Sequence, residues 1–126
     1  MKVLVMYVDE FGYRPAQKNL ETAEEITEGA KFSDSIVAFI QVEESDEEYD
    51  VKSREKKLVN HLKWTARKNN CKSIILHSFA HLSESKASIE FTKAVFDQAE
   101  IRLQNAEFKT AQTPFGYFLD LGIKAP

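Results

Sequence analysis

The residue best placed for chemistry in this chain is a histidine in the polar turn that follows one apolar run. Ile74, Ile75 and Leu76 form the core of a run of strand length, His77 ends it, and His81 follows in a short segment with small neighbours. A strand that ends in a loop before a helix is where α/β proteins usually place functional side chains. His81 is therefore a candidate functional residue, with a purely structural histidine as the alternative.

Other common signatures of catalysis or metal binding are absent. His77 and His81 are four residues apart, but His77 ends a strand, so helical spacing does not align them as a metal-binding pair. Cys71 lies just before that strand, and we expect a half-buried thiol that only fills space there rather than a nucleophile. The chain has no phosphate-binding glycine loop, no Gly-x-Ser-x-Gly elbow and no His-Glu-x-x-His helix. No metal and no cofactor is expected.

Length and composition indicate an ordinary globular chain with one domain over residues 1–126. It has 126 residues, of which 43% are hydrophobic and 29% are charged, and a net charge of −3. Because proteins that grip a long stretch of nucleic acid are usually basic, a broad electrostatic footprint is not expected. A small pocket for the end of an RNA remains open.

The cellular context is predicted to be cytoplasmic. Cys71 is the only cysteine, so no internal disulfide can form, which fits a reducing compartment. The apolar start from Met1 to Tyr7 is too short for a signal peptide, and no run is long enough to cross a membrane.

The elements that must position these residues follow from apolar periodicity. We expect strands at 2–7, 35–42, 72–77, 107–110 and 116–123, and helices at 51–69 and 85–105. The first strand should end at Asp9, with turn or hairpin residues at 11–15, and the acidic run 43–50 should be a flexible surface loop. Ser83 or Ser85 is the candidate cap of the second helix.

The predicted order is two strands, a helix, a strand, a helix and two strands. Two helices of about five turns with four or five strands favour a two-layer α/β sandwich or a mixed sheet with helices packed on it.

Three segments carry a resemblance to a known family. Ser78-Phe79-Ala80-His81-Leu82-Ser83, Thr113-Pro114-Phe115-Gly116-Tyr117 and Val37-Ala38-Phe39-Ile40-Gln41-Val42-Glu43 occur in this order and spacing. Together with the strand before Asp9, they resemble the N-terminal editing domain of archaeal threonyl-tRNA synthetases. The resemblance spans essentially the whole chain.

The resemblance implies a fold like that of D-aminoacyl-tRNA deacylases: a two-layer α/β fold with a mixed β-sheet and two long helices, usually homodimeric. It implies hydrolysis of mischarged seryl-tRNA(Thr). For this chain we expect a deacylase that acts in trans on that substrate or on a D-aminoacyl-tRNA. The 3′ end of the tRNA would enter the pocket, and its 2′-hydroxyl would contribute to catalysis. A threonyl-tRNA synthetase is a further expected partner. Hydrolytic editing is one answer to the limited discrimination that binding gives between similar amino acids.

The resemblance also assigns roles to particular residues. Ala80 matches a small residue beside the aminoacyl group, where a larger side chain would fill the space. It implies one catalytic residue, His81, and five substrate-binding residues: Asp9, Ala80, Phe115, Gly116 and Tyr117.

The chain departs from the family pattern at several positions. Phe118-Leu119 replaces a Tyr-Lys pair, His77-Ser78 replaces Tyr-Pro, and the chain stops at Pro126 where the family runs on. Two hypotheses therefore stay open. The first is an aminoacyl-tRNA deacylase. The second is a catalytically degenerate member of the fold that acts as a nucleotide- or protein-binding dimeric accessory module.

Overall fold

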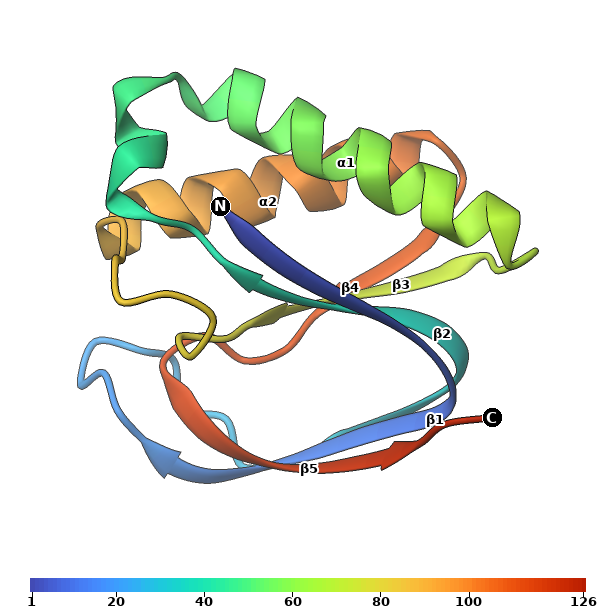
Figure 1. The fold of residues 1–126 in the computed structure, drawn as a ribbon. Helices are drawn as coiled ribbons and strands as arrows, with labels where there is room; N and C mark the ends of the chain where they lie inside the picture. The colour runs from blue at the N-terminus through green and yellow to red at the C-terminus, as the bar shows by residue number, and fades with distance from the viewer.

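The computed structural model describes residues 1–126 and contains one five-stranded sheet with two helices packed on it (Figure 1). The elements are β1 (Lys2–Lys18), β2 (Ala30–Gln41), the short 3₁₀ helix η1 (Glu44–Glu48), α1 (Val51–Lys68), β3 (Ser73–Ser78), α2 (Ile89–Asn105), β4 (Lys109–Gln112) and β5 (Tyr117–Lys124). This confirms the predicted order and the two-layer α/β class, in the form that a D-aminoacyl-tRNA deacylase-like fold implies.

The sheet is mixed, with strand order β4-β3-β2-β1-β5. β1 runs antiparallel to β2 and β5, whereas β2, β3 and β4 are mutually parallel. Figure 1 shows β1 curving strongly along its length, so its first half lies beneath the helices and its second half lies with β5 at the far side of the molecule. The curvature gives β2 and β3 neighbours on both faces.

The core explains the continuous apolar runs of β2 and β3. Ile36 and Ile74 face the helices and join a cluster of 16 buried residues that includes the apolar faces of α1 and α2. Val37 and Ile75 point to the opposite face and pack in a second cluster with Phe11. Strands that are buried on both faces need apolar side chains at successive positions rather than at alternate ones.

Both helices begin at a side-chain cap. The Asp50 carboxylate accepts a hydrogen bond from the Ser53 N–H at 2.7 Å, and Ser88 caps α2 through the Phe91 N–H at 3.2 Å. The expected cap at Ser83 or Ser85 is wrong, because both residues lie in the loop that ends β3. This loop is longer than predicted, and it forms part of the site described below.

The expected end of the first strand at Asp9 is also wrong. β1 continues to Lys18, because Phe11 is fully buried and pairs with Phe32, and the residues after it pair with β5. Asp9 is exposed, and an exposed charge on the solvent side does not interrupt a ladder of backbone hydrogen bonds. The turn expected at 11–15 is therefore strand.

The acidic run 43–50 is ordered rather than a flexible loop. Glu44–Glu48 forms η1, and Asp46 within it is only 2% exposed. Its carboxylate contacts the amino group of Met1 at 2.8 Å and Arg54 at 3.4 Å. Buried charges need partners of this kind, which a count of acidic residues cannot indicate.

Candidate functional site

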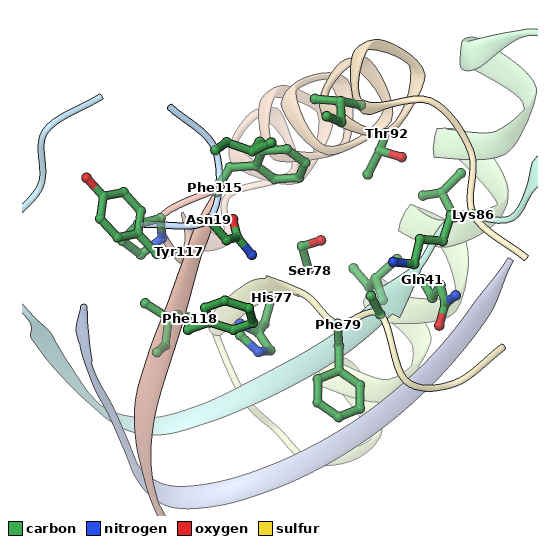
Figure 2. A pocket seen from close by; sticks show the side chains of 18 of the residues that line it. Asn19, Gln41, His77, Ser78, Phe79, Lys86, Thr92, Phe115, Tyr117 and Phe118 are labelled. Atoms are coloured by element: carbon green, nitrogen blue, oxygen red, sulfur yellow. The ribbon is translucent and has the colours of Figure 1, made fainter. Parts of the chain in front are cut away.

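One cavity of about 420 Å³ lies at the edge of the sheet where the parallel strands β2 and β3 end. Its walls are the ends of these two strands, the loop after β3, the start of α2, residues 19–20 and the segment from Pro114 to Leu121 (Figure 2). The carboxyl ends of parallel strands are the usual place for ligand sites in α/β folds. The volume is in the range, about 300–1,000 Å³, of small-ligand pockets.

The loop after β3 is held against the end of β2 by one buried glutamine. Gln41 is 4% exposed, and its Nε2 donates to the carbonyl oxygens of Ser83 and Ser85, both at 2.8 Å. Its Oε1 accepts from the N–H groups of Leu82 at 2.7 Å and Ser83 at 2.9 Å. A single amide therefore uses both donors and its acceptor to fix the loop that carries His81.

Glu43 ties the same loop at a second point. Its carboxylate accepts a hydrogen bond from the Ser83 hydroxyl at 2.8 Å and contacts the amino group of Met1 at the same distance. The bond from the amino group, which has the larger effect, and the bond from Ser83 together hold the pKa of Glu43 below its usual value. Backbone bonds from Phe79 to Ile40 and from Ala87 to Val42, both at 2.9 Å, anchor the two ends of the loop.

Ala80 and His81 both line the cavity, as the sequence led us to expect of neighbouring site residues. The His81 ring packs edge-on against Phe79, with 5.1 Å between ring centroids. Figure 2 shows the Phe79 ring pointing away from the interior of the cavity. His81 therefore stands at the rim, where it has no hydrogen-bond partner within the chain.

His77 lies at the floor of the cavity and is 6% exposed. Its Nδ1 lies 2.9 Å from the Thr113 hydroxyl, and the ring packs edge-on against Phe39. Burial lowers the pKa of His77 to about 4, so the imidazole is neutral at neutral pH. The bond at Nδ1 is the only hydrogen bond of this ring. Because no fully buried side-chain nitrogen or oxygen lacks a partner, the unbonded Nε2 is not fully buried, and a molecule in the cavity can reach it.

The second motif forms the opposite wall. The Thr113 N–H donates to the Leu76 carbonyl at 3.0 Å, which brings the chain after β4 beside the end of β3. Phe115, Gly116 and Tyr117 follow and line the cavity, with Phe118 57% exposed beside them. This wall offers aromatic faces, which suit stacking on a nucleobase.

Gly116 and Tyr117 have clear structural tasks. Gly116 has φ +87°, and a Cβ there would lie 2.8 Å from the Ala23 Cβ. The resemblance implied that Gly116 binds the substrate, whereas the close approach that the structure shows is to Leu20 and Ala23. The Tyr117 hydroxyl donates to the Glu24 carbonyl and accepts from the Ile26 N–H. Both residues hold the segment that supplies Asn19 and Leu20 to the cavity.

Asp9 is the one predicted site residue that the structure does not bring to the cavity. It lies in the middle of β1, with an exposed side chain, and is not among the lining residues. The other five predicted residues line the same cavity, although they come from segments more than 30 positions apart.

The polar residues of the cavity that sequence reasoning missed include Asn19, Gln41, His77 as a floor residue, and Lys86. Two of them had a visible signal. Gln41 interrupts the apolar run of β2, and His77 ends that of β3, which marks polar groups at buried strand ends. Asn19 and Lys86 lie in irregular segments where nothing local distinguishes them.

No group of three or more His, Cys, Asp or Glu side chains lies close enough together to hold a metal ion. None of the helices is long and apolar enough to span a membrane.

Comparison with known proteins points to one family. The family model described as the Archaea-specific editing domain of threonyl-tRNA synthetase matches residues 1–126. Similar proteins named threonine–tRNA ligase include those of Methanobrevibacter smithii, 31% identical over 121 residues, and Thermococcus onnurineus, 30% identical over 121 residues. That of Cenarchaeum symbiosum is 27% identical over 117 residues. These alignments cover 94%, 94% and 93% of the chain but only 20%, 19% and 18% of the three relatives, so the chain spans about a fifth of their length.

Proposed function

Because the chain belongs to the family of archaea-specific editing domains of threonyl-tRNA synthetase, whose work is tRNA editing, we propose that it is an aminoacyl-tRNA deacylase. Its substrate is mischarged seryl-tRNA(Thr) or a D-aminoacyl-tRNA, and it acts in trans. The observation that carries this proposal is the single cavity that gathers Ala80, His81 and the Phe115–Tyr117 wall.

The cavity suits the 3′-terminal aminoacyl-adenosine. The adenine stacks on the aromatic wall at Phe115 and Phe118, since every base offers a face to such side chains. The aminoacyl group then lies beside Ser78 and Ala80, where small side chains leave room. On this placement, Ala80 limits the size of the aminoacyl group that enters.

Hydrolysis breaks the ester bond between the aminoacyl carbonyl carbon and the ribose oxygen. A water molecule adds to the carbonyl carbon and gives up a proton, and negative charge develops on the carbonyl oxygen. The bond to the ribose oxygen then breaks, and this oxygen takes up a proton and leaves as the ribose hydroxyl. His81 orients the substrate or the water from the rim. His77 offers Nε2 from the floor, as an acceptor in the tautomer whose Nδ1–H donates to Thr113. The ribose 2′-hydroxyl assists the water, as the family resemblance implies.

One observation favours the second candidate function, a catalytically degenerate binding module. Two polar groups of the cavity already have partners within the chain: the Tyr117 hydroxyl bonds to residues 24 and 26, and the Gln41 amide bonds to the loop after β3. Leu119 adds an apolar side chain to the lining. A nucleotide could bind to such a cavity without being hydrolysed.

A deacylation assay separates the two candidates. The chain is incubated with seryl-, threonyl- and D-aminoacyl-tRNA(Thr), and release of the amino acid is measured. The deacylase proposal predicts hydrolysis, a fall in kcat/KM of about tenfold or more for His81→Ala, the cost of one lost hydrogen bond, and loss of activity for Ala80→Leu. His61→Ala, an exposed histidine in mid-α1, is the matched control. Absence of hydrolysis with every ester would reject the enzyme.

We further propose that the chain forms a homodimer through β5. This strand is at the edge of the sheet and exposes Leu121 and Ile123 at 37% and 41%. An edge strand with exposed apolar side chains can pair with a second copy. Sedimentation should show a dimer that Leu121→Glu with Ile123→Glu dissociates. A monomer at all concentrations would exclude this assembly.

A further inference from the structure

Lys86 is the only lysine, arginine, aspartate or glutamate among the residues that line the cavity. Figure 2 shows it on the same side as Gln41, with its ammonium group directed inward, while Phe115, Tyr117 and Phe118 occupy the other side. The cavity therefore has an aromatic side and a side with one positive charge.

The position of Lys86 is fixed although its side chain is free. The Ser85 carbonyl accepts a bond from Gln41 at 2.8 Å, and the Ala87 N–H donates to Val42 at 2.9 Å. The residues on both sides of Lys86 are thus anchored to β2. The Lys86 ammonium makes no hydrogen bond and no ion pair within the chain, although other lysines, such as Lys18 and Lys31, do form ion pairs. An unpaired cation held at a cavity is available to an anionic ligand.

We propose that Lys86 binds the phosphate group attached to the 5′ oxygen of the terminal nucleotide, an inference that rests on the proposed function. The terminal nucleotide carries three groups: a base, an aminoacyl ester and a phosphate. The base lies against the aromatic wall, and the aminoacyl ester lies against the small residues Ser78 and Ala80. Of the three groups, only the phosphate carries a negative charge in the ground state. Lys86 is the only ionised side chain that complements it.

The exposure of Lys86 distinguishes a phosphate contact from a role at the ester. The side chain is exposed, at the mouth of the cavity, whereas the floor is formed by buried His77. A phosphodiester backbone has to pass through the mouth, since the rest of the RNA stays outside. Lys86 is thus a binding residue whose loss weakens affinity and leaves the chemical step unchanged.

The test uses two non-hydrolysable probes that differ by one phosphate. Both are 3′-amino-3′-deoxyadenosine with serine in amide linkage, one with a free 5′-hydroxyl and the other with a 5′-monophosphate. Dissociation constants are measured by calorimetry for the original chain, Lys86→Ala, Lys86→Gln and the control Lys109→Ala. Lys109 is also exposed, but it does not line the cavity.

The original chain and Lys109→Ala should bind the phosphorylated probe about three- to tenfold more tightly, the size expected for a charge-assisted contact near solvent. Lys86→Ala and Lys86→Gln should bind both probes equally. A preference that survives in Lys86→Ala, or is absent from the original chain, would overturn the Lys86 inference alone. Failure of both probes to bind would overturn the proposed substrate and the inference with it.

Discussion

Replacing Gln41 by leucine tests whether one buried amide holds the His81 loop in place. Leucine is similar in size but can neither donate nor accept. The substitution removes two bonds from Nε2, to Ser83 and Ser85, and two to Oε1, from Leu82 and Ser83. Because Gln41 is only 4% exposed, water cannot replace these bonds while the loop stays closed.

The four bonds set the size of the effect. At a net contribution of about 0.5–1.5 kcal/mol for each hydrogen bond, they stabilise the closed loop by about 2–6 kcal/mol. We expect the lower end of this range, since the loop keeps its backbone anchors at Phe79 and Ala87. A loss of about 2 kcal/mol raises the open fraction of the loop about 30-fold.

Native-state hydrogen exchange measures this opening directly. The Leu82 and Ser83 amides should exchange about 30-fold faster in Gln41→Leu, and deacylation or probe binding should fall with them. Gln112→Leu is the control, because the Gln112 amide makes two hydrogen bonds from its Nε2, with Asp97 and Glu100 on α2, and none with the His81 loop. It should leave exchange at Leu82 and Ser83 unchanged.

Gln41→Glu sharpens the test. The carboxylate can still accept from the two N–H groups, but it repels the Ser83 and Ser85 carbonyl oxygens, whereas the protonated acid supplies one donor. The loop should therefore be better protected at acidic pH than at neutral pH in this variant. If Gln41→Leu folds and its Leu82 and Ser83 amides exchange as slowly as in the original chain, the clamp does not exist.

Three further predictions concern stability. His77 has a pKa of about 4 in the folded chain against an ordinary value of 6.5, so it takes up its proton more readily in the unfolded chain. Its contribution to the free energy of unfolding is therefore full above pH 6.5 and is lost as pH falls towards 4, by up to about 3 kcal/mol. Urea unfolding of His77→Gln should show a smaller loss of stability over this pH window than the unsubstituted chain. Gly116→Ala should cost about 1–2 kcal/mol or more, because its φ is +87° and its Cβ would press on Ala23, whereas Gly122→Ala, with open space around it, should stay within about 0.5 kcal/mol. Arg102→Met should lower the urea midpoint more than the double variant Arg102→Met with Glu55→Met. The single change leaves the buried Glu55 carboxylate without the guanidinium that bonds to both of its oxygens. Equal midpoints for the two variants would contradict this.

The helices and the inner strands could be predicted from the sequence because their signal is local. α1 was expected at 51–69 and runs from Val51 to Lys68, since one face of it packs on the sheet at helical spacing. β2 and β3 were found as apolar runs for the same reason: both of their faces are buried.

The second half of β1 could not be predicted, because its stability comes from partners far along the chain. Residues 10–18 pair with residues 117–124, and several of their side chains are exposed, so no periodic pattern marks them. The buried carboxylate of Asp46 was hidden in the same way, since its partners are Met1 and Arg54.

In the candidate site, too, the local features could be predicted from the sequence and the long-range contacts could not. Ala80 and His81 are close in sequence, as are Phe115, Gly116 and Tyr117. Two short motifs therefore contain candidate residues for two opposite walls of the cavity. What the motifs could not show is how each polar group is used. Tyr117 is committed to residues 24–26, and the cation of the cavity comes from Lys86, in the segment before α2.

The balance between deacylase and binding module therefore depends on the polar groups that remain free. Gln41, Thr113 and Tyr117 already have protein partners, so they position the walls and have little capacity left for a substrate. Three groups that remain free are the rim imidazole of His81, Nε2 of His77 and the Lys86 ammonium. A neutral imidazole can orient water or the ribose hydroxyl, but the lowered pKa of His77 makes it a weak base, so an active enzyme must draw its remaining assistance from the RNA itself. A substrate whose terminal ribose lacks the 2′-hydroxyl should then bind normally and resist hydrolysis. If it were hydrolysed at the ordinary rate, the assistance would have to come from a protein group such as His81 and not from the RNA.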